Sequence, residues 1–581
     1  MIEFSANRTM GKILQDSFYQ IPRFQRPFSW TLDNVGDLWS DTIQQSTGQY
    51  FIGAFIVYKQ PPDKHGNAPL REYAIVDGQQ RLTTVTVLIA ALRDQFSELG
   101  EEDLAKGIQR YIQKEDKRNL PQLIIETEGG FPYFQTAIQS YPTVESGIQA
   151  YNRTDEKLLA QAYGYFRTQL TSLNKSVKSN TTIAKEDRTA AYVAELEKIR
   201  DRVLGLSAIL VGVDDEDDAY EIFETLNARG KNLNLVDLLR NFLLRDLREQ
   251  NDSLDVPRHR FNAVLASLQG EGFELEADEF VLHSWLSRHK YTSKKKLFAN
   301  MKIEIKTKEQ KAKLLRELEL DVALYRKVRR PLSVTWSKEM SHIRRSLRAL
   351  QIFVVTQPTP LLLAALRSYE NDKMTSLKSL KRLFAAVESF HFQYTTVTGA
   401  SSSGGVSARY ALHGRAFSDA DGDSSSMNID RLIKKLQGDM PSRDEFVAGF
   451  SEMNYSSTNS IRKDVVRYAL ERLYEASAGR GVTVDFTGMT IEHIAPEHPG
   501  TDDEALDPRS VESIGNLMLV SEALNQLLAN KSFAEKQAIL SKEKHLWIDP
   551  FILSAKSWGG KEIAERGRQL GDVGYNKVWK L

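Results

Sequence analysis

The pattern of hydrophobic and polar positions predicts strands and helices interleaved over about the first 250 residues. The runs 50–58 and 73–76 are continuous, apolar and rich in β-branched residues, as buried strands are. A third strand is predicted over 204–213, and helices over 9–16 and through 88–96. This region is therefore predicted to be a mixed α and β domain.

The middle of the chain, from about 255 to 395, carries apolar residues at helical spacing. We expect a helical bundle there. The Gly- and Ser-rich stretch that follows is typical of a flexible linker or mobile loop. Beyond it the pattern is amphipathic again, as in a helix predicted over 465–476. The predicted domains are an N-terminal domain over 1–250, a helical connecting domain over 251–398, a linker over 399–428 and a C-terminal domain over 429–581.

Composition bounds the function without naming it. A chain of 581 residues is too long for one core, and its 41% hydrophobic and 27% charged residues are ordinary for a globular protein. Lys+Arg 77 balance Asp+Glu 77, so any DNA-binding surface must be a local patch. The lack of cysteine excludes disulfides and thiolate chemistry and fits a reducing cytosol. No apolar run approaches the roughly 20 residues that span a membrane, so we expect a cytoplasmic protein without a membrane partner.

Near the C-terminus, an acidic residue stands beside a histidine at the end of a short apolar run. Glu492 can ligate a divalent cation while His493 takes a proton from water. Asn525, on a predicted helix, can add an amide oxygen, the kind of ligand that hard cations prefer. A single histidine in a strand is more often a satisfied structural residue. Together with an asparagine, however, the acid–histidine pair has the residue types that can build a metal-dependent phosphodiesterase.

A second candidate site lies at a predicted strand-to-helix turn, Asp77-Gly78-Gln79-Gln80-Arg81. Free N–H groups and the positive end of the helix can bind an anion there, and Arg81 can add a bidentate phosphate contact. The glycine-rich loop G-x-x-x-x-G-K-[ST] occurs nowhere in the chain. Upstream, residues 19–30 present aromatics interleaved with Arg23 and Arg26, which suits a base or a phosphate. The alternative is a proline-anchored plug over a sheet edge.

Basic residues cluster in the predicted helical middle, around Lys294, Lys295 and Lys296. Such a cluster either touches the DNA backbone or is a solvated face.

Two sets of motifs resemble one family. Residues 21–30, 76–81 and 223–233 resemble the N-terminal half of GmrSD-type modification-dependent restriction enzymes. Residues 490–496 and 514–520, with Asn525 and the segment 530–536, resemble their C-terminal nuclease half. The resemblance covers about 1–250 and 430–581. It implies an α+β, multidomain fold: a ParB/sulfiredoxin-like N-terminal domain, a helical middle and a ββα-metal (His-Me finger, HNH-like) nuclease.

The resemblance also implies roles for individual residues. In the nuclease, Glu492 and Asn525 would hold Mg²⁺ or Mn²⁺, His493 would activate water, and Asn516 would orient the ring of His493. Many relatives of the wider nuclease class carry Asp or His in place of Glu492. Lys531, within the nuclease motif, joins Lys294, Lys295 and Lys296 as a candidate DNA contact. The residues implied in binding a nucleoside triphosphate, GTP or another, are Arg26, Asp77, Gly78, Gln79, Gln80, Arg81, Asn227 and Arg229.

The predicted function is a DNA endonuclease of anti-phage defence that cleaves modified double-stranded phage DNA under the control of nucleotide binding or hydrolysis. One alternative is a nucleotide-gated DNA-binding regulator whose nuclease site is weak or inactive. Another keeps the nuclease but makes the N-terminal domain a reader of modified DNA without nucleotide turnover. The modification, the nucleotide and the formation of a homodimer stay open.

Overall fold

The computed structural model is a mixed α and β structure that divides into two compact units, Met1–Arg248 and Glu249–Leu581. Each unit is described by itself. The described residues are 2–22, 25, 27–44, 50–60, 73–116, 119–127, 133–141, 154–214, 235–247, 256–400, 404–418, 422–455, 459–478, 484–497 and 506–581. Throughout these ranges, no helix is both long and apolar enough to cross a membrane.

The first unit is built on a six-stranded sheet in the order β1-β8-β3-β4-β2-β7. The strands are β1 (Ile2–Thr9), β2 (Tyr19–Ile21), β3 (Phe51–Lys59), β4 (Tyr73–Asp77), β7 (Ile125–Thr127) and β8 (Ser207–Val213). β3 runs antiparallel to β4 and parallel to β8, while β2 is parallel to both β4 and β7. The strands predicted over 50–58, 73–76 and 204–213 are therefore confirmed.

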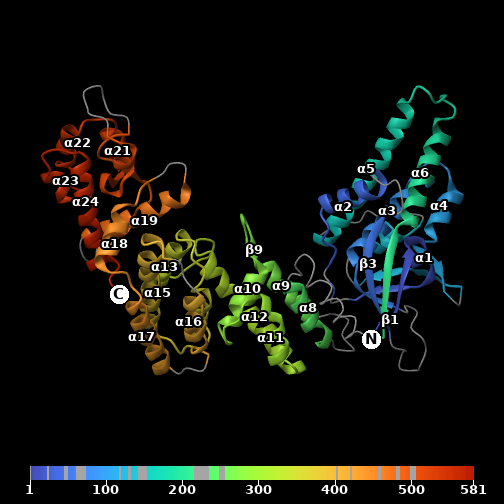
Figure 1. Ribbon diagram of the computed structural model, residues 1–581, viewed down its shortest axis with the longest axis horizontal. Helices are drawn as coiled ribbons and strands as arrows, with labels where there is room; N and C mark the ends of the chain where they lie inside the picture. The colour runs from blue at the N-terminus through green and yellow to red at the C-terminus, as the bar shows by residue number, and fades with distance from the viewer. Residues whose placement is uncertain are drawn as a thin grey trace. The chain divides into compact units, whose positions relative to one another are not determined.

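Helices cover this sheet. They are α1 (Met10–Asp16), α2 (Leu32–Trp39), α3 (Gln79–Glu98), α4 (Glu102–Gln109), α5 (Thr154–Ser179), α6 (Arg188–Gly205) and α8 (Leu235–Asp246), with π-helical turns η1 (Ser40–Gln44) and η2 (Phe134–Gln139) and a small hairpin of β5 (Gln113–Glu115) and β6 (Pro121–Leu123). α3 is buried along almost its whole length and contacts α4, α5 and α6. The two long helices α5 and α6 lie side by side (Figure 1). The main core of the unit thus forms around α3, on one side of the sheet.

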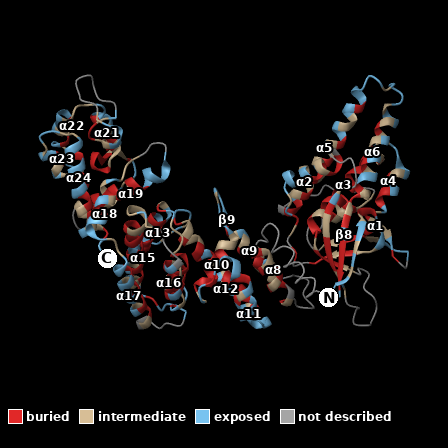
Figure 2. Ribbon diagram, in the orientation of Figure 1, coloured by how far each residue is buried: buried red, intermediate tan, exposed pale blue. Residues whose placement is uncertain are grey.

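The second unit begins with helices. These are α9 (Val256–Ser267), α10 (Ala277–Leu286), α11 (Lys294–Glu304), α12 (Lys308–Arg329), α13 (Ser341–Ile352), α14 (Thr359–Glu370), α15 (Leu377–His391), α16 (Gly404–Arg415), α17 (Gly422–Gly438), α18 (Arg443–Ser451) and α19 (Ser460–Ser477), with the short η3 (Lys338–Met340), η4 (Phe392–Val397), β9 (Gln269–Gly270) and β10 (Phe273–Glu274). Buried positions recur along these helices (Figure 2). Within 399–428, which composition predicted as a linker, α16 packs against α14.

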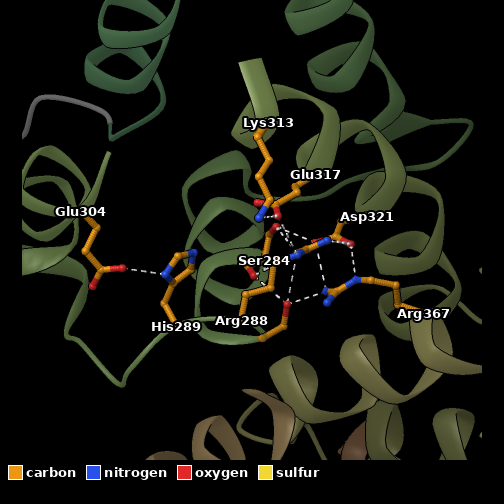
Figure 3. Close-up of polar contacts among 9 residues, drawn as sticks. Ser284, Arg288, His289, Glu304, Lys313, Glu317, Asp321 and Arg367 are labelled. Carbon is orange, nitrogen blue, oxygen red and sulfur yellow. Dashed lines mark hydrogen bonds and ion pairs between the residues drawn. The ribbon is translucent and has the colours of Figure 1, made fainter. Parts of the chain in front are cut away.

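A buried ionic cluster joins three of these helices. Asp321 on α12 is fully buried and receives hydrogen bonds from Arg288 Nη2 at 3.0 Å, Arg367 Nε at 2.9 Å and the Ser284 hydroxyl at 2.6 Å. Figure 3 shows the guanidinium groups of Arg288 and Arg367 converging on this one carboxylate; Arg288 lies just after α10 and Arg367 lies on α14. A buried charge needs such partners, so Asp321 links α10, α12 and α14.

The unit ends with β11 (Met489–His493), α20 (Pro508–Glu512), η5 (Ile514–Asn516), β12 (Leu517–Ser521), α21 (Glu522–Leu528), α22 (Phe533–Leu540), α23 (Pro550–Ser554), α24 (Gly560–Val573) and η6 (Gly574–Val578).

A second buried cluster connects the helical middle to this C-terminal part. Glu388 on α15 accepts hydrogen bonds from Tyr468 on α19 and from Ser346 on α13, both at 2.6 Å. The Tyr468 hydroxyl in turn accepts from Trp579 Nε1 at 2.9 Å, and the Trp579 ring stacks on Phe392 with centroids 4.1 Å apart. The residues predicted as a connecting domain and as a C-terminal domain therefore share buried side chains.

Candidate active site

The candidate nuclease residues lie on a two-stranded sheet and the helices that follow it. β11 and β12 are antiparallel, with Glu492 opposite Met518 and His493 opposite Leu517. α21 follows β12 directly and contacts both strands. Ser521 caps α21 by accepting a hydrogen bond from the backbone N–H of Leu524. The strand, strand and helix thus bring Glu492, His493 and Asn525 to one part of the unit.

Glu492 is held by a lysine that the sequence did not single out for this task. The Lys536 ammonium, on α22, donates to Glu492 Oε1 at 2.6 Å and to the carbonyl oxygen of His493 at 2.6 Å. Both side chains are almost completely buried. Burial raises the pKa of the Glu492 carboxyl, and the ammonium of Lys536 opposes part of that rise.

His493 has the properties of a neutral base. Burial lowers the pKa of its imidazole, so the ring is uncharged at neutral pH. Its Nε2 lies 3.3 Å from Glu497 Oε1, but the two atoms do not have the geometry of a hydrogen bond. This buried nitrogen therefore has no hydrogen-bond partner among the described residues. The Tyr455 ring meets the imidazole edge to face, with centroids 5.7 Å apart. Nε2 is therefore available to accept a proton.

Asn525 is oriented by its amide nitrogen. Nδ2 donates to the Thr490 hydroxyl at 2.7 Å and to the carbonyl oxygen of Ile491 at 3.3 Å. This side chain is half-buried, and its hydrogen bonds with the described residues use Nδ2 alone. The amide oxygen, which is the atom that a hard cation would use, stays open.

The structure corrects the role that the resemblance implied for Asn516. Its Oδ1 accepts from the backbone N–H of Ala495 at 2.8 Å and from Trp558 Nε1 at 2.9 Å. Its Nδ2 donates to the carbonyl oxygens of Ala495 and Val511, at 3.0 and 2.8 Å. These four bonds use the whole capacity of the amide. The predicted bond to the His493 ring is not made, and Asn516 instead ties three segments together.

The donor set at this site has the chemistry for Mg²⁺ or Mn²⁺. Glu492 offers a carboxylate oxygen and Asn525 an unused amide oxygen, and the unpartnered nitrogen of His493 is not needed as a ligand. In the described ranges, no three His, Asp or Glu side chains gather as a ligand cluster. The site therefore fits a hard cation through few protein ligands, with the remaining positions left to water and substrate oxygens, as is usual for Mg²⁺.

The predicted nucleotide turn is formed, but its side chains are engaged within the first unit. Gly78 has φ +91° at the start of α3, and a Cβ there would lie 2.3 Å from the Phe55 ring, so only glycine fits. Asp77 Oδ1 accepts from the backbone N–H of Gly78 at 2.7 Å. Arg81 donates to the carbonyl oxygens of Ile52 and Ala54, both at 2.8 Å. Arg81 therefore anchors β3.

The neighbouring glutamine holds the segment that carries the N-terminal motif. Gln80 Oε1 accepts from the backbone N–H of Ser29 at 2.9 Å, and its Nε2 donates to the carbonyl oxygen of Pro27 at 3.1 Å. Gln79 is buried beside it. The two motifs of the first unit, far apart in the chain, thus meet at the start of α3. Arg26, Asn227 and Arg229 lie outside the described residues.

The lysines predicted to contact DNA differ in exposure and in ion pairing. Lys294 forms an ion pair with Asp278 at 3.2 Å, whereas Lys295 and Lys296 are exposed and form no ion pair with any residue that the structure describes. Lys531 is half-buried just before α22.

A buried imidazole beside a carboxylate and an open amide oxygen, carried on a strand, strand and helix, has the chemistry that a hydrolase site requires. Comparison with known families gives the identity. Residues 10–244 match the N-terminal domain of the GmrSD restriction endonucleases, and residues 440–573 match the C-terminal domain of the GmrSD restriction endonucleases. The chain belongs to this family and is a restriction endonuclease. No curated protein matches the chain.

Proposed function

We propose that this restriction endonuclease cleaves modified phage DNA by metal-dependent hydrolysis at Glu492, His493 and Asn525. The observation that carries the proposal is the buried, unpartnered Nε2 of His493, next to a carboxylate and an open amide oxygen. A nuclease must hold a base near a phosphodiester while the departing oxygen is stabilised.

The chain's own residues account for the proton transfer. His493, neutral because it is buried, takes a proton from the attacking water at Nε2. Glu497, 3.3 Å from that nitrogen, stabilises the imidazolium that results. Glu492 and Asn525 would hold the cation through oxygen atoms. Bound Mg²⁺ or Mn²⁺ would supply a Lewis acid for the phosphate and the departing 3′ oxygen.

The test is His493→Ala, measured as nicking of modified DNA in Mg²⁺ and in Mn²⁺. We expect a loss of about 10²- to 10⁴-fold, the usual contribution of a general base. His545→Ala, which removes an exposed histidine of the same unit, is the control and should cut at the parent rate. Cleavage by His493→Ala within a few-fold of the parent would refute the proposal. A parent chain that binds DNA and cuts nothing with either metal would instead be a regulator.

We also propose that a nucleoside triphosphate binds the first unit at the start of α3 and regulates cleavage. The support is the left-handed Gly78 at the N-terminus of a long helix, where backbone N–H groups and the helix dipole favour phosphate. Arg81 contributes less directly than its charge suggests, because two of its donors hold β3.

Thermal unfolding of the full chain with and without GTP or another triphosphate tests this. A ligand at 100 times its Kd stabilises the folded state by about 2.7 kcal/mol, so binding is visible as a higher unfolding temperature of the first unit. Arg81→Ala should lower the unfolding temperature of the first unit and reduce the increase that the nucleotide causes. Arg110→Ala, which removes an exposed arginine of the same unit, should change neither quantity. If no triphosphate shifts the parent, nucleotide binding is refuted while the nuclease proposal stands.

Finally, we propose that the exposed Lys295 and Lys296 bind the DNA backbone. Reversing both to Glu should weaken DNA binding and flatten its dependence on salt, since each phosphate contact adds about 0.9 to the salt slope. Lys434→Glu, at another exposed position of the second unit, serves as the control. An unchanged salt slope for the double variant would make this cluster a solvated face.

A further inference from the structure

Lys536 is placed unusually for a lysine. Its residue is 1% exposed, and its ammonium is joined to the candidate metal ligand Glu492 and to the backbone of the candidate base His493. Lysine is seldom fully buried unless it is paired. Together the two contacts place the positive charge at the junction of two candidate catalytic residues.

The contact divides the two oxygens of Glu492. Oε1 is occupied by Lys536, at 2.6 Å, and no other side chain of the described residues donates to this carboxylate, so Oε2 is the oxygen that could face a cation. The ion pair also cancels the carboxylate's charge. A divalent cation at Oε2 would therefore meet an ion pair without net negative charge, in a partly desolvated site where charges act strongly on one another.

We infer that Lys536 is a positioning residue of the nuclease site that fixes Glu492 as a one-oxygen ligand and weakens cation binding in the absence of DNA. This inference rests on the proposed metal-dependent function. Its consequence is that the negative charge needed for tight cation binding arrives with the DNA phosphate. Substrate and cation then bind cooperatively, and the site stays largely unloaded until DNA is present.

The experiment measures binding of Mn²⁺ alone to the full chain by electron paramagnetic resonance, with and without DNA. In Lys536→Met, at a pH above the raised pKa of Glu492, the carboxylate keeps its charge and the ammonium that offset it is gone, so Mn²⁺ should bind about tenfold more tightly without DNA. The gain in Mn²⁺ affinity on adding DNA should shrink. Lys542→Met, at an exposed position just after α22, should match the parent. A rise in affinity cannot come from general loosening of the fold, so it separates positioning from packing.

Lys536→Gln guards against a variant that does not fold, because it keeps a hydrogen-bond donor for the oxygens of Glu492 and His493 while removing the charge. It should show the same rise in Mn²⁺ affinity. An Mn²⁺ affinity within twofold of the parent in either folded variant overturns the inference. Failure of both variants to fold would also overturn it, by showing that Lys536 is a structural anchor. A parent that binds no Mn²⁺ with DNA present refutes the proposed metal dependence instead.

Discussion

Replacing Asn516 with alanine separates a structural from a catalytic role at the nuclease site. The side chain is fully buried and makes four hydrogen bonds, two of them to Ala495, one to Val511 and one to Trp558. At a net contribution of about 1 kcal/mol each, with backbone groups left unsatisfied, the loss amounts to roughly 3–5 kcal/mol. For a unit of this size, that corresponds to a fall of about 5–10 °C in unfolding temperature.

The assay is scanning calorimetry of the full chain alongside DNA cleavage at a temperature where the variant is still folded. We expect unfolding temperature and cleavage to fall together, because the loop that follows His493 loses its anchor. Asn371→Ala, at an exposed position of the same unit and outside the nuclease motif, should leave both unchanged. A loss of cleavage of 10²-fold or more with an unchanged unfolding temperature would refute the structural role and indicate that Asn516 takes part in catalysis.

Three further outcomes are expected. Asp321→Ala leaves two buried guanidinium groups without their shared carboxylate and should lower stability by roughly 3–5 kcal/mol in urea unfolding, and an undiminished midpoint would contradict this. Tyr455→Leu should slow cleavage by about 2- to 10-fold through loss of the ring contact with His493, whereas Tyr455→Phe should cut like the parent; equal rates for both variants would exclude a role for the ring. Burial lowers the pKa values of His283 and His391 to about 3 in the folded chain. In the unfolded chain the pKa of each imidazole is near 6.5, so the unfolded state gains a proton first as the pH falls. The folded state should therefore lose roughly 1.4 kcal/mol of stability per histidine between pH 7 and pH 5.5. Urea unfolding at pH 7 and 5.5 should show this loss, and His391→Gln should reduce it; an identical pH dependence in that variant would contradict the assignment.

The sequence predicted those parts that depend on local pattern. The β-branched run 50–58 became β3, because a continuous apolar segment of that length is most stable when buried in a sheet. The roles of Asn516 and Lys536 could not be predicted, since their partners are brought together only by folding: Lys536 meets Glu492 across 44 positions of the chain. Gln80 likewise meets Ser29 across 51 positions. Tertiary contacts also decide the stretch after residue 400, where α16 forms despite a composition rich in Gly and Ser, because it packs against α14.

The cluster of Glu388, Tyr468, Phe392 and Trp579 bears on how such enzymes can be recombined. A cut between residues 398 and 429 would separate Trp579 from Phe392, the ring on which it stacks. It would also place Glu388 and its hydrogen-bond donor Tyr468 on different fragments. An isolated piece from 429 onward would expose aromatic surface and aggregate. Exchange of the nuclease between related proteins, whether by evolution or by design, should therefore carry α13, α15 and η4 with it, so that the inherited module begins upstream of the glycine- and serine-rich stretch.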